Sequence, residues 1–493
     1  MGAIVGIDLG TTTTVAARFN AGGEPEGVDL WNDEKFIHSA FFFESANPDE
    51  PALIGEMARE AAGFHFQEGA FSLYKRDMGT DTFYTAHGRT YTPAGLTKLM
   101  LERLLRHLMM TFGEVSSLAI TVPANFANRA RMQTMQAAFD AGFPAPIQVI
   151  DEPTAAALYH AHTSPVPLDG NYLIYDFGGG TLDVSIININ GGDINVVRSD
   201  GVAKLGGMDL DKVVHDLIQA EFFRLKGENF LIDDTGFGIA QAEKVKEQLS
   251  SAPNRTVSIF TSKHGKVNVT VTQADFVSAA KPIFDQSFEC VERVLSAAFM
   301  DKSEIAGVFM AGGTSYIPEL ERRLADMFGF DPVRRNPSQA IALGAAVFAA
   351  HRAYAEQPEL LGHEQGAKIK DKSLVEVCPY YLGTTAETDD EVEFNSVILR
   401  KGDPRPASVT MDFFVIEDGQ ESIRCDVTQC REDTQDLDHP ELTRIFDEYM
   451  PLPSGCRKGD TLRVTFTYDC NGVFKGEFLE VEGGKVTEFE GNL

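Results

Sequence analysis

The spacing of hydrophobic positions divides the chain into two regions. Up to about residue 356, helical and strand patterns follow one another. Residues 92–113 carry apolar side chains at helical spacing behind an N-cap threonine and a proline, and 126–142 predict a second helix. The apolar runs 117–123 and 147–151 are typical of buried strands. This alternation predicts an α/β domain over residues 1–356.

The pattern changes after this region. Residues 357–376 are polar and show neither period, which predicts an interdomain linker. Within 460–481, apolar and polar residues alternate on both sides of Asn471-Gly472, which is typical of a β-hairpin. We therefore expect an all-β domain over residues 377–493.

Composition limits the classes of function. The 493 residues carry a formal net charge of −30, which disfavours nucleic acid and anionic membrane surfaces as partners. The chain has no run of eighteen uncharged apolar residues and no basic, leucine-rich N-terminal segment, so we expect a cytoplasmic protein without a membrane span. Its six cysteines lack CxxC spacing, which indicates free thiols rather than a zinc site or disulfides.

Two glycine-rich turns have matching surroundings. The segments "IVGIDLGTTTTVAA" (4–17) and "YDFGGGTLDV" (175–184) each predict a strand, a Gly/Thr-rich turn and a second strand. Neither fits a P-loop, but both offer backbone N–H groups and threonine hydroxyls to a phosphate. Asp8 and Asp176 stand where a hydrated Mg²⁺ would need carboxylates. Either turn alone is better explained as a hairpin turn; the matched pair favours a polyphosphate site.

Three further stretches carry weaker signals. Glu152 precedes a proline after a predicted strand, which a simple helix start explains as well as a functional role does. The strand before Gly312-Gly313 leads into a predicted helix whose N-terminus would favour an anion. The spacing of Glu243, Lys246 and Ser250 puts them on one face of a predicted helix, which taken alone is more often a solvated face than a binding site.

Together these segments resemble the heat-shock protein 70 (DnaK-type) chaperone family. The motifs "GIDLGTTT", "KRDMG", "ITVPANF", "IDEPTAAA", "YDFGGGTLDVS", "LGGMDLD", "AEKVKEQLSSA", "AGGTSYIP" and "NPSQAIALGAAV" occur in this order over residues 3 to about 350. The resemblance implies an actin-like, two-lobed ATPase domain that binds ATP or ADP with Mg²⁺, followed by a β-sandwich substrate-binding domain. The chain ends at Leu493, directly after the predicted sandwich, so we expect no helical lid.

The resemblance also implies roles for individual residues. Hydrolysis would depend on Lys75, Glu152 and Thr181 together with Asp8 and Asp176, the last two holding hydrated Mg²⁺. Phosphate-contacting positions are Gly10, Thr11, Thr12, Thr13, Gly178, Gly179, Gly180 and Thr181, with Gly206 and Gly207 completing this part of the nucleotide site. Adenosine contacts would come from Glu243, Lys246, Ser250, Gly312, Gly313 and Tyr316. No phosphate-site position is missing, so we expect an active ATPase.

Several positions depart from the family pattern. Glu247 and Tyr316 replace two arginines that enclose the adenine in many relatives; tyrosine can still stack on a base, but glutamate gives no cation-π contact. Ser338 replaces a common aspartate. Gln148 stands in place of an arginine that engages the J-domain co-chaperone, so this partner, and with it an exchange factor, is in doubt.

The C-terminal region departs further. Glu387 replaces an apolar residue that arches over bound peptide, whereas Ile416 and Ile423 match an arch and a pocket position. From 384 to 493 there are 25 acidic against 11 basic residues, which favours apolar client segments flanked by basic residues. The segment 371–377 corresponds to the family's apolar linker but carries lysine and serine at two apolar positions, which predicts weak interdomain coupling.

Three functional hypotheses follow. The first is an ATP-driven chaperone that binds extended polypeptide segments under nucleotide control. The second is a nucleotide-dependent switch or adaptor for one dedicated protein partner. The third is a small-molecule phosphotransferase of the same fold. The chaperone versions of the motifs and the appended sandwich favour the first.

Overall fold

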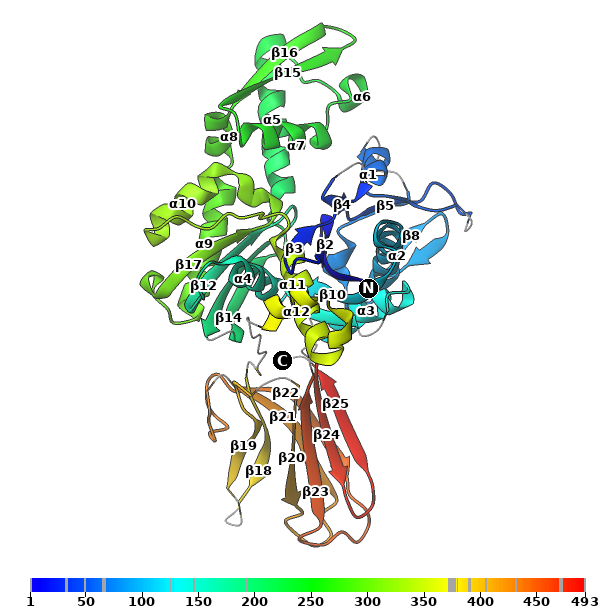
Figure 1. The fold of residues 1–493 in the computed structure, drawn as a ribbon, viewed down its shortest axis with the longest axis vertical. Helices are drawn as coiled ribbons and strands as arrows, with labels where there is room; N and C mark the ends of the chain where they lie inside the picture. Colours follow the sequence, from blue (N-terminus) through cyan, green and yellow to red (C-terminus); the bar gives the residue numbers. More distant parts are fainter. Residues whose placement is uncertain are drawn as a thin grey trace. The chain divides into compact units, whose positions relative to one another are not determined.

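The computed structural model describes residues 2–31, 34–47, 50–63, 68–124, 126, 128–144, 147–190, 193–370, 378, 380–388, 392–403, 406–430, 432–469 and 473–491. The chain forms two compact units, a larger one with most of residues 1–372 and a smaller one with most of residues 373–493 (Figure 1). Among the helices of the described ranges, none combines the length and the apolar character that a membrane span needs.

The first lobe of the larger unit is built on a mixed sheet. Its strand order is β11-β10-β1-β2-β3, and β4 pairs with β2. β1 and β2 form an antiparallel hairpin, and β10 joins β1 in parallel. The strands are β1 (Ala3–Leu9), β2 (Thr13–Phe19), β3 (Pro25–Gly27), β4 (Phe36–His38), β10 (Val115–Val122) and β11 (Ile147–Asp151). The buried strands predicted at 117–123 and 147–151 are therefore confirmed.

Helices and smaller strands complete this lobe. The predicted helix after Thr92 is α2 (Pro93–Phe112), and the Thr92 side chain accepts a hydrogen bond from the Gly95 amide, as an N-cap should. The second predicted helix is α3 (Asn128–Asp140). The remaining elements are β5 (Ala40–Phe42), β6 (Leu53–Ile54), α1 (Glu56–Gly63), β7 (Ala70–Ser72), η2 (Tyr74–Asp77), β8 (Tyr84–Ala86) and β9 (Arg89–Tyr91).

The second lobe repeats the central arrangement. Its sheet has the order β14-β13-β12-β17, formed by β12 (Gly170–Phe177), β13 (Leu182–Asn190), β14 (Asp193–Val202) and β17 (Ile305–Ala311). β12 and β13 form an antiparallel hairpin, and β17 joins β12 in parallel. The two glycine turns thus occupy equivalent places, each at the tip of the hairpin that opens its lobe.

Two helices rich in small residues pack beside these sheets. α4 (Glu152–Thr163) and α11 (Ala340–Glu356) approach so closely that a Cβ on Gly344 would lie 1.7 Å from the Ala155 carbonyl oxygen. A Cβ on Gly6 of β1 would lie 2.1 Å from the Ala346 amide nitrogen of α11. Only glycine permits these approaches, which fix where α4, and Glu152 at its start, can lie.

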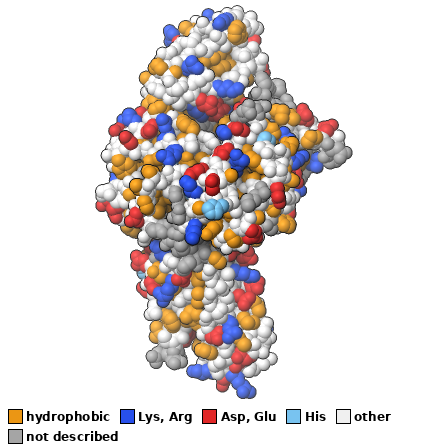
Figure 2. All heavy atoms as spheres, in the orientation of Figure 1, with side chains coloured by type: hydrophobic (Ala, Val, Ile, Leu, Met, Phe, Trp, Pro, Cys, Tyr) orange, Lys and Arg blue, Asp and Glu red, His pale blue; other side chains and the backbone are white. Residues whose placement is uncertain are grey.

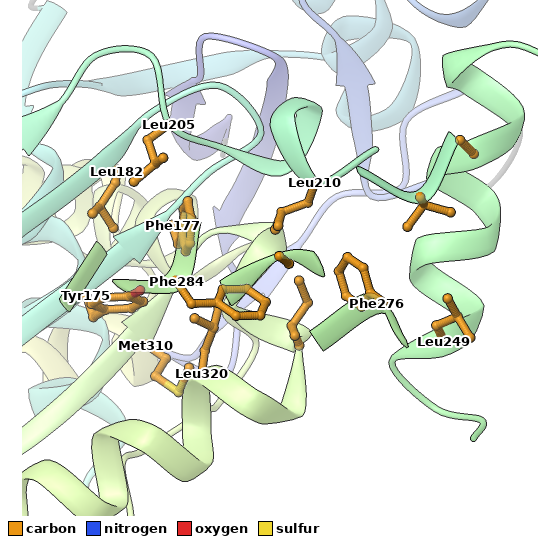
Figure 3. Packing of buried hydrophobic residues seen from close by; sticks show 14 of the residues in the cluster. Tyr175, Phe177, Leu182, Leu205, Leu210, Leu249, Phe276, Phe284, Met310 and Leu320 are labelled. Atoms are coloured by element: carbon orange, nitrogen blue, oxygen red, sulfur yellow. The ribbon is translucent and has the colours of Figure 1, made fainter. Parts of the chain in front are cut away.

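The second lobe has a continuous apolar core. Figure 3 shows Tyr175 and Phe177 of β12 and Leu182 of β13 with Phe284 and Leu320 from the covering helices. The elements around this core are α5 (Gly207–Lys226), α6 (Ile232–Thr235), α7 (Ile239–Leu249), β15 (Asn254–Thr261), β16 (Gly265–Thr272), α8 (Gln273–Ala279), α9 (Lys281–Ala297), η3 (Lys302–Glu304), η4 (Gly313–Tyr316) and α10 (Pro318–Phe328).

The segment predicted as a linker is partly helical. It contains η5 (Pro358–Leu360) and α12 (His363–Lys370), so the prediction of irregular structure is wrong for these residues. The reason lies in tertiary contacts: Gln365 donates to the Phe19 carbonyl at 3.1 Å and Lys368 pairs with Glu24 at 2.7 Å. Residues 371–377 lie outside the described residues, and the domain boundaries stay a prediction.

The smaller unit is a sandwich of two four-stranded sheets, with orders β19-β18-β21-β22 and β20-β23-β24-β25. Its strands are β18 (Tyr381–Glu387), β19 (Glu393–Leu399), β20 (Ala407–Phe414), β21 (Ser422–Cys430), β22 (Thr443–Pro451), β23 (Thr461–Tyr468), β24 (Phe474–Glu480) and β25 (Val486–Gly491). The predicted hairpin is the antiparallel pair β23–β24, although the turn residues 471 and 472 lie outside the described ranges. The predicted all-β character is confirmed.

Candidate functional site

The two glycine turns face each other. A Cβ on Gly179 in the turn between β12 and β13 would lie 2.4 Å from Thr12 Oγ1 in the turn between β1 and β2. The first turn spans Gly10 to Thr13 and is anchored by Ser39, whose hydroxyl donates to the Gly10 carbonyl at 2.8 Å. The structure therefore brings together the two segments for which the sequence predicts phosphate binding as a pair.

The second turn rests on the start of α5. The Gly178 amide donates to the Thr181 carbonyl at 3.0 Å, and the Gly207 amide donates to the Gly178 carbonyl at 3.0 Å. A Cβ on Gly206 would lie 2.5 Å from the Gly180 amide nitrogen. These contacts place Gly206 and Gly207 directly against the turn, as expected for one nucleotide site.

A buried ion pair lies beside the turns. Lys75 Nζ is 2.5 Å from Glu152 Oε1, and the two side chains are 5% and 10% exposed. Lys75 belongs to η2 and Glu152 begins α4. Arg76, the next residue in η2, donates to the Gly180 carbonyl and so links η2 to the second turn.

Three aspartates share this environment. Burial and the nearby Glu152 carboxylate raise the pKa of Asp8 to about 7, although Thr121 donates a hydrogen bond to it. The same two causes raise the pKa of Asp183 to about 7. Burial, followed by repulsion from Glu152, raises the pKa of Asp176 well above its usual range. The group combines four carboxylates, including that of Glu152, with the ammonium of Lys75.

Sequence reasoning missed Asp183. In the β12–β13 hairpin, Asp183 is paired directly opposite Asp176, so both side chains lie on one face of the sheet. The Thr181 hydroxyl also hydrogen-bonds Asp183. The register could have been obtained from the length of the glycine turn, because residues equally distant from the tip of a hairpin are cross-strand partners.

This excess of buried negative charge suits a cation. Within the part of the chain that the structure describes, no three His, Cys, Asp or Glu side chains converge closely enough to chelate a metal directly. Mg²⁺ retains several waters and needs few protein ligands, so separated carboxylates fit a hydrated Mg²⁺ better than a fully protein-ligated ion. Asp8 and Asp176 have the donor chemistry for such an ion.

The three predicted adenosine contacts on and next to α7 have different partners. Lys246 of α7 is buried, lies 2.7 Å from Asp211 Oδ1 and donates to the Gly207 carbonyl at 3.2 Å, which brings it to the second turn. Glu243 instead pairs with Arg59 of α1, in the first lobe. Ser250 caps α7 and donates to the Lys246 carbonyl.

The glycine pair after β17 also borders the site. Gly312 has φ 79°, and a Cβ there would lie 2.3 Å from the Phe177 carbonyl oxygen, whereas a Cβ on Gly313 would meet no atom of the described residues within 4 Å. The predicted order of strand, glycine pair and helix is confirmed: the short 3₁₀ helix η4 begins at Gly313, and α10 begins at Pro318. Tyr316 in η4 is 44% exposed and therefore free to stack on a ligand.

The residues that depart from the family pattern differ in burial and in hydrogen bonding. Ser338 Oγ is 3.4 Å from the Tyr316 hydroxyl, and burial raises the pKa of Glu247. Gln148 in β11 is 3% exposed, and among the residues that the structure describes its amide oxygen has no hydrogen-bond partner. In the sandwich, Glu387 ends β18, Ile416 is 44% exposed and Ile423 packs against the buried cluster of Val415, Leu452 and Cys456.

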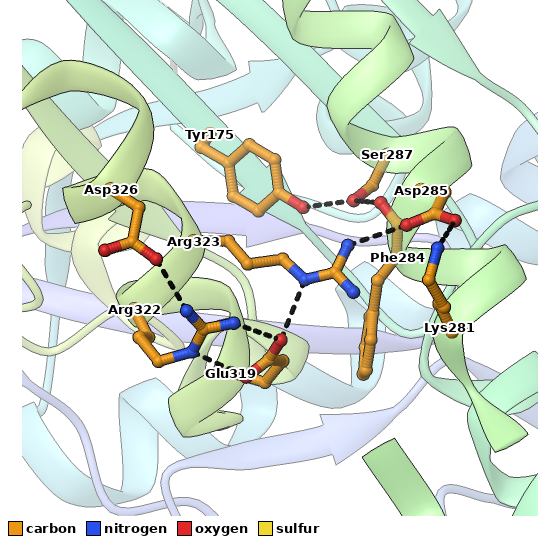
Figure 4. Close-up of polar contacts among 9 residues, drawn as sticks. All are labelled: Tyr175, Lys281, Phe284, Asp285, Ser287, Glu319, Arg322, Arg323 and Asp326. Atoms are coloured by element: carbon orange, nitrogen blue, oxygen red, sulfur yellow. Dashed lines mark hydrogen bonds and ion pairs between the residues drawn. The ribbon is translucent and has the colours of Figure 1, made fainter. Parts of the chain in front are cut away.

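β12, the strand that carries Asp176, is fixed by contacts with α9 on the face of the sheet opposite Asp176. Figure 4 shows Tyr175 donating to Ser287 of α9 at 2.8 Å, while Arg323 of α10 contacts Asp285 of α9 at 2.8 Å. Because side chains alternate along a strand, Tyr175 points into the core while Asp176 points to the opposite face. The network therefore fixes the strand without occupying the site.

The site and the fold define a two-lobed ATPase domain joined to a β sandwich. A family model described as "Hsp70 protein" matches residues 81–490. The chain is 30% identical over 491 residues to the chaperone protein DnaK of Thermosipho africanus, covering 98% of this chain and 78% of that protein. It is 28% identical over 492 residues to the DnaK of Thermotoga neapolitana, covering 98% and 79%. The chain belongs to the heat-shock protein 70 family of nucleotide-binding, ATP-dependent chaperones, and the predicted resemblance and ATPase class are confirmed.

Proposed function

We propose that the larger unit hydrolyses Mg²⁺-bound ATP between its two glycine turns. The observation that carries this proposal is the buried Lys75–Glu152 pair set among Asp8, Asp176 and Asp183, next to the two facing glycine turns. Gly10 to Thr13 and Gly178 to Thr181 would bind the phosphates, with Gly206 and Gly207 supporting the second turn. Glu243, Lys246, Ser250, Gly312, Gly313 and Tyr316 would surround the adenosine.

Each charged residue has a distinct proposed role. The Lys75 ammonium would offset charge that develops on the transferred phosphoryl group, and Glu152 would hold this ammonium in place. Mg²⁺, when bound, supplies further neutralisation of the phosphates, and Asp8 and Asp176 would orient its waters. Asp183, with its pKa raised to about 7, is suited to accept a proton from the attacking water at neutral pH.

The test compares Lys75→Met with Lys212→Met. Lys212 is an exposed lysine on α5, so its substitution controls for loss of a positive charge. We expect Lys75→Met to slow single-turnover ATP hydrolysis by about 10²-fold or more, while ATP affinity measured by calorimetry changes only a few-fold. Hydrolysis by Lys75→Met at the wild-type rate would contradict the assignment.

The smaller unit is proposed to bind polypeptide segments, with its affinity set by the nucleotide bound to the larger unit. The support is family membership together with the two-sheet sandwich. A J-domain co-chaperone and an exchange factor are possible partners by family, and Gln148 is the position at which the first would be tested. The cytoplasmic location expected from the sequence stays a prediction.

A peptide array probed with ATP-bound and ADP-bound protein tests this part. Binding to many apolar segments, weaker with ATP than with ADP, is the expected result. A single strong ligand would instead support the adaptor hypothesis, which the family assignment does not favour. Binding that is the same with both nucleotides would contradict nucleotide control.

A further inference from the structure

A cysteine, a histidine and a glutamate form a chain of contacts in the smaller unit. Cys430 ends β21, and its Sγ lies 3.7 Å from His439 Nδ1, within hydrogen-bonding range for sulfur. His439 Nε2 lies 3.4 Å from Glu432 Oε2. His439 and Glu432 both belong to the connection between β21 and β22. The three side chains are thus arranged as a thiol, a base and a carboxylate.

The backbone determines which histidine nitrogen is the base. The Glu441 amide donates a hydrogen bond to His439 Nδ1 at 3.3 Å, so in the neutral ring this nitrogen carries the lone pair. The ring proton then lies on Nε2, which faces the Glu432 carboxylate. The accepting nitrogen of the imidazole therefore faces the thiol.

We propose that Cys430 is a peroxide-reactive thiol that is reversibly oxidised to a sulfenic acid, with His439 as its base and Glu432 as a positioning residue. Cys430 Sγ attacks one oxygen of a hydroperoxide, the S–H bond breaks and its proton passes to His439 Nδ1. The S–O bond forms as the O–O bond breaks, and the leaving oxygen takes the proton back from His439. For hydrogen peroxide the products are the sulfenic acid and one water, so sulfur is oxidised and the peroxide is reduced.

Two other cysteines of the same unit give internal controls. Cys425 lies on the same strand, and burial raises the pKa of its thiol to about 12. Cys456 donates its thiol hydrogen to the Gln420 carbonyl at 3.0 Å, which favours the protonated, unreactive form. All three cysteines are buried, so a difference in reactivity would reflect the neighbouring groups rather than general exposure.

Access restricts which reagents can react. Cys430 is 2% exposed, and the connection that carries His439 is held to β19 because Asn395 donates to the carbonyls of Thr434 and Gln435. A small hydroperoxide needs little opening, whereas a bulky aromatic disulfide needs the connection to move away. The proposal therefore names hydrogen peroxide as the reagent.

The test measures sulfenic acid formation in the full chain. Protein is treated with hydrogen peroxide at pH 7, trapped with dimedone and digested, and the labelling of each cysteine is followed by mass spectrometry. We expect Cys430 to react at least about tenfold faster than Cys425 or Cys456, His439→Gln to remove this advantage, and a thiol reductant to restore the untrapped protein. Glu432→Gln should slow Cys430 by a smaller factor.

A second variant keeps the test decisive. Glu432 is 70% exposed, so Glu432→Gln leaves the fold intact even if His439→Gln disturbs the connection. Equal labelling of the three cysteines, or a Cys430 rate that neither variant lowers, would overturn the proposal.

Discussion

Asp8→Asn should make the nucleotide-free protein more stable at pH 8 while weakening its use of Mg²⁺-ATP. Asp8 lies among Glu152, Asp176 and Lys75, and its ionised form is unfavourable there because of burial and repulsion. Asparagine removes the charge, keeps the shape and can still accept the hydrogen bond from Thr121. The wild-type Asp8 would thus favour binding of Mg²⁺-ATP at the expense of the stability of the nucleotide-free protein.

The magnitude follows from the pKa. The pKa of Asp8 is raised from 3.8 to about 7 in the folded chain, and one pKa unit is worth about 1.4 kcal/mol. A raised folded pKa means that the protonated carboxyl contributes its stability in full below about pH 4, and that this stability is lost as the pH rises to about 7. The gain from Asp8→Asn should therefore approach zero near pH 4 and reach at most about 4 kcal/mol at pH 8.

The assay is urea unfolding from pH 5 to pH 8, followed by the fluorescence of Trp31. This residue is the single tryptophan of the chain and packs against the core of the first lobe, so its signal reports the larger unit. Asp331→Asn, at an exposed aspartate, is the matched control. Adding Mg²⁺-ADP should stabilise wild type more than Asp8→Asn.

The decisive result is how the stability difference between Asp8→Asn and wild type depends on pH. The difference between Asp8→Asn and wild type should fall by about 1.4 kcal/mol for each pH unit below pH 7. A variant that is no more stable than wild type at pH 8, or whose gain is the same at every pH, would refute the assignment of Asp8 to a repulsive carboxylate cluster.

Three more predictions concern the same site. Gly206→Ala should destabilise the larger unit by about 2 kcal/mol or more in urea unfolding, because its Cβ would lie 2.5 Å from backbone, whereas Gly313→Ala should fold normally and only weaken ATP binding in calorimetry. Tyr316→Ala should lower nucleotide affinity by about 1 kcal/mol through loss of stacking, and unchanged affinity would exclude Tyr316 from the base site. Asp183→Asn should slow single-turnover hydrolysis by about 10²-fold, and a normal rate would exclude it as the proton acceptor.

The elements predicted best from the sequence are those fixed by local chemistry. Both glycine turns lie at hairpin tips, because a run of glycines and threonines between two β-branched segments leaves little alternative. Glu152 does begin a helix, with Pro153 in its first turn, so the interpretation of this segment as a helix start is confirmed. That interpretation is compatible with a role of Glu152 in the site. One residue can start a helix and also supply a buried carboxylate.

Other features depend on contacts between distant segments. The Lys75–Glu152 pair joins residues 77 positions apart, and Arg59–Glu243 joins residues 184 positions apart, so no periodicity could predict either. α12 was missed because its own pattern is weak and its order comes from contacts with the β2–β3 hairpin. Propensity gives only a weak prior when tertiary packing decides the structure.

The charge cluster links ligand binding to proton release. At neutral pH, Asp8 and Asp183 are near their raised pKa values of about 7, so each is partly protonated in the empty site. A bound cation favours the ionised carboxylates and must displace these protons, so the affinity for Mg²⁺-nucleotide should rise as the pH increases through 7. Over the same range the nucleotide-free protein loses stability, because the carboxylates with raised pKa values ionise without a bound cation to offset their charge. Opposite slopes of affinity and stability with pH would therefore share one physical cause, the placement of four carboxylates around the ammonium of Lys75.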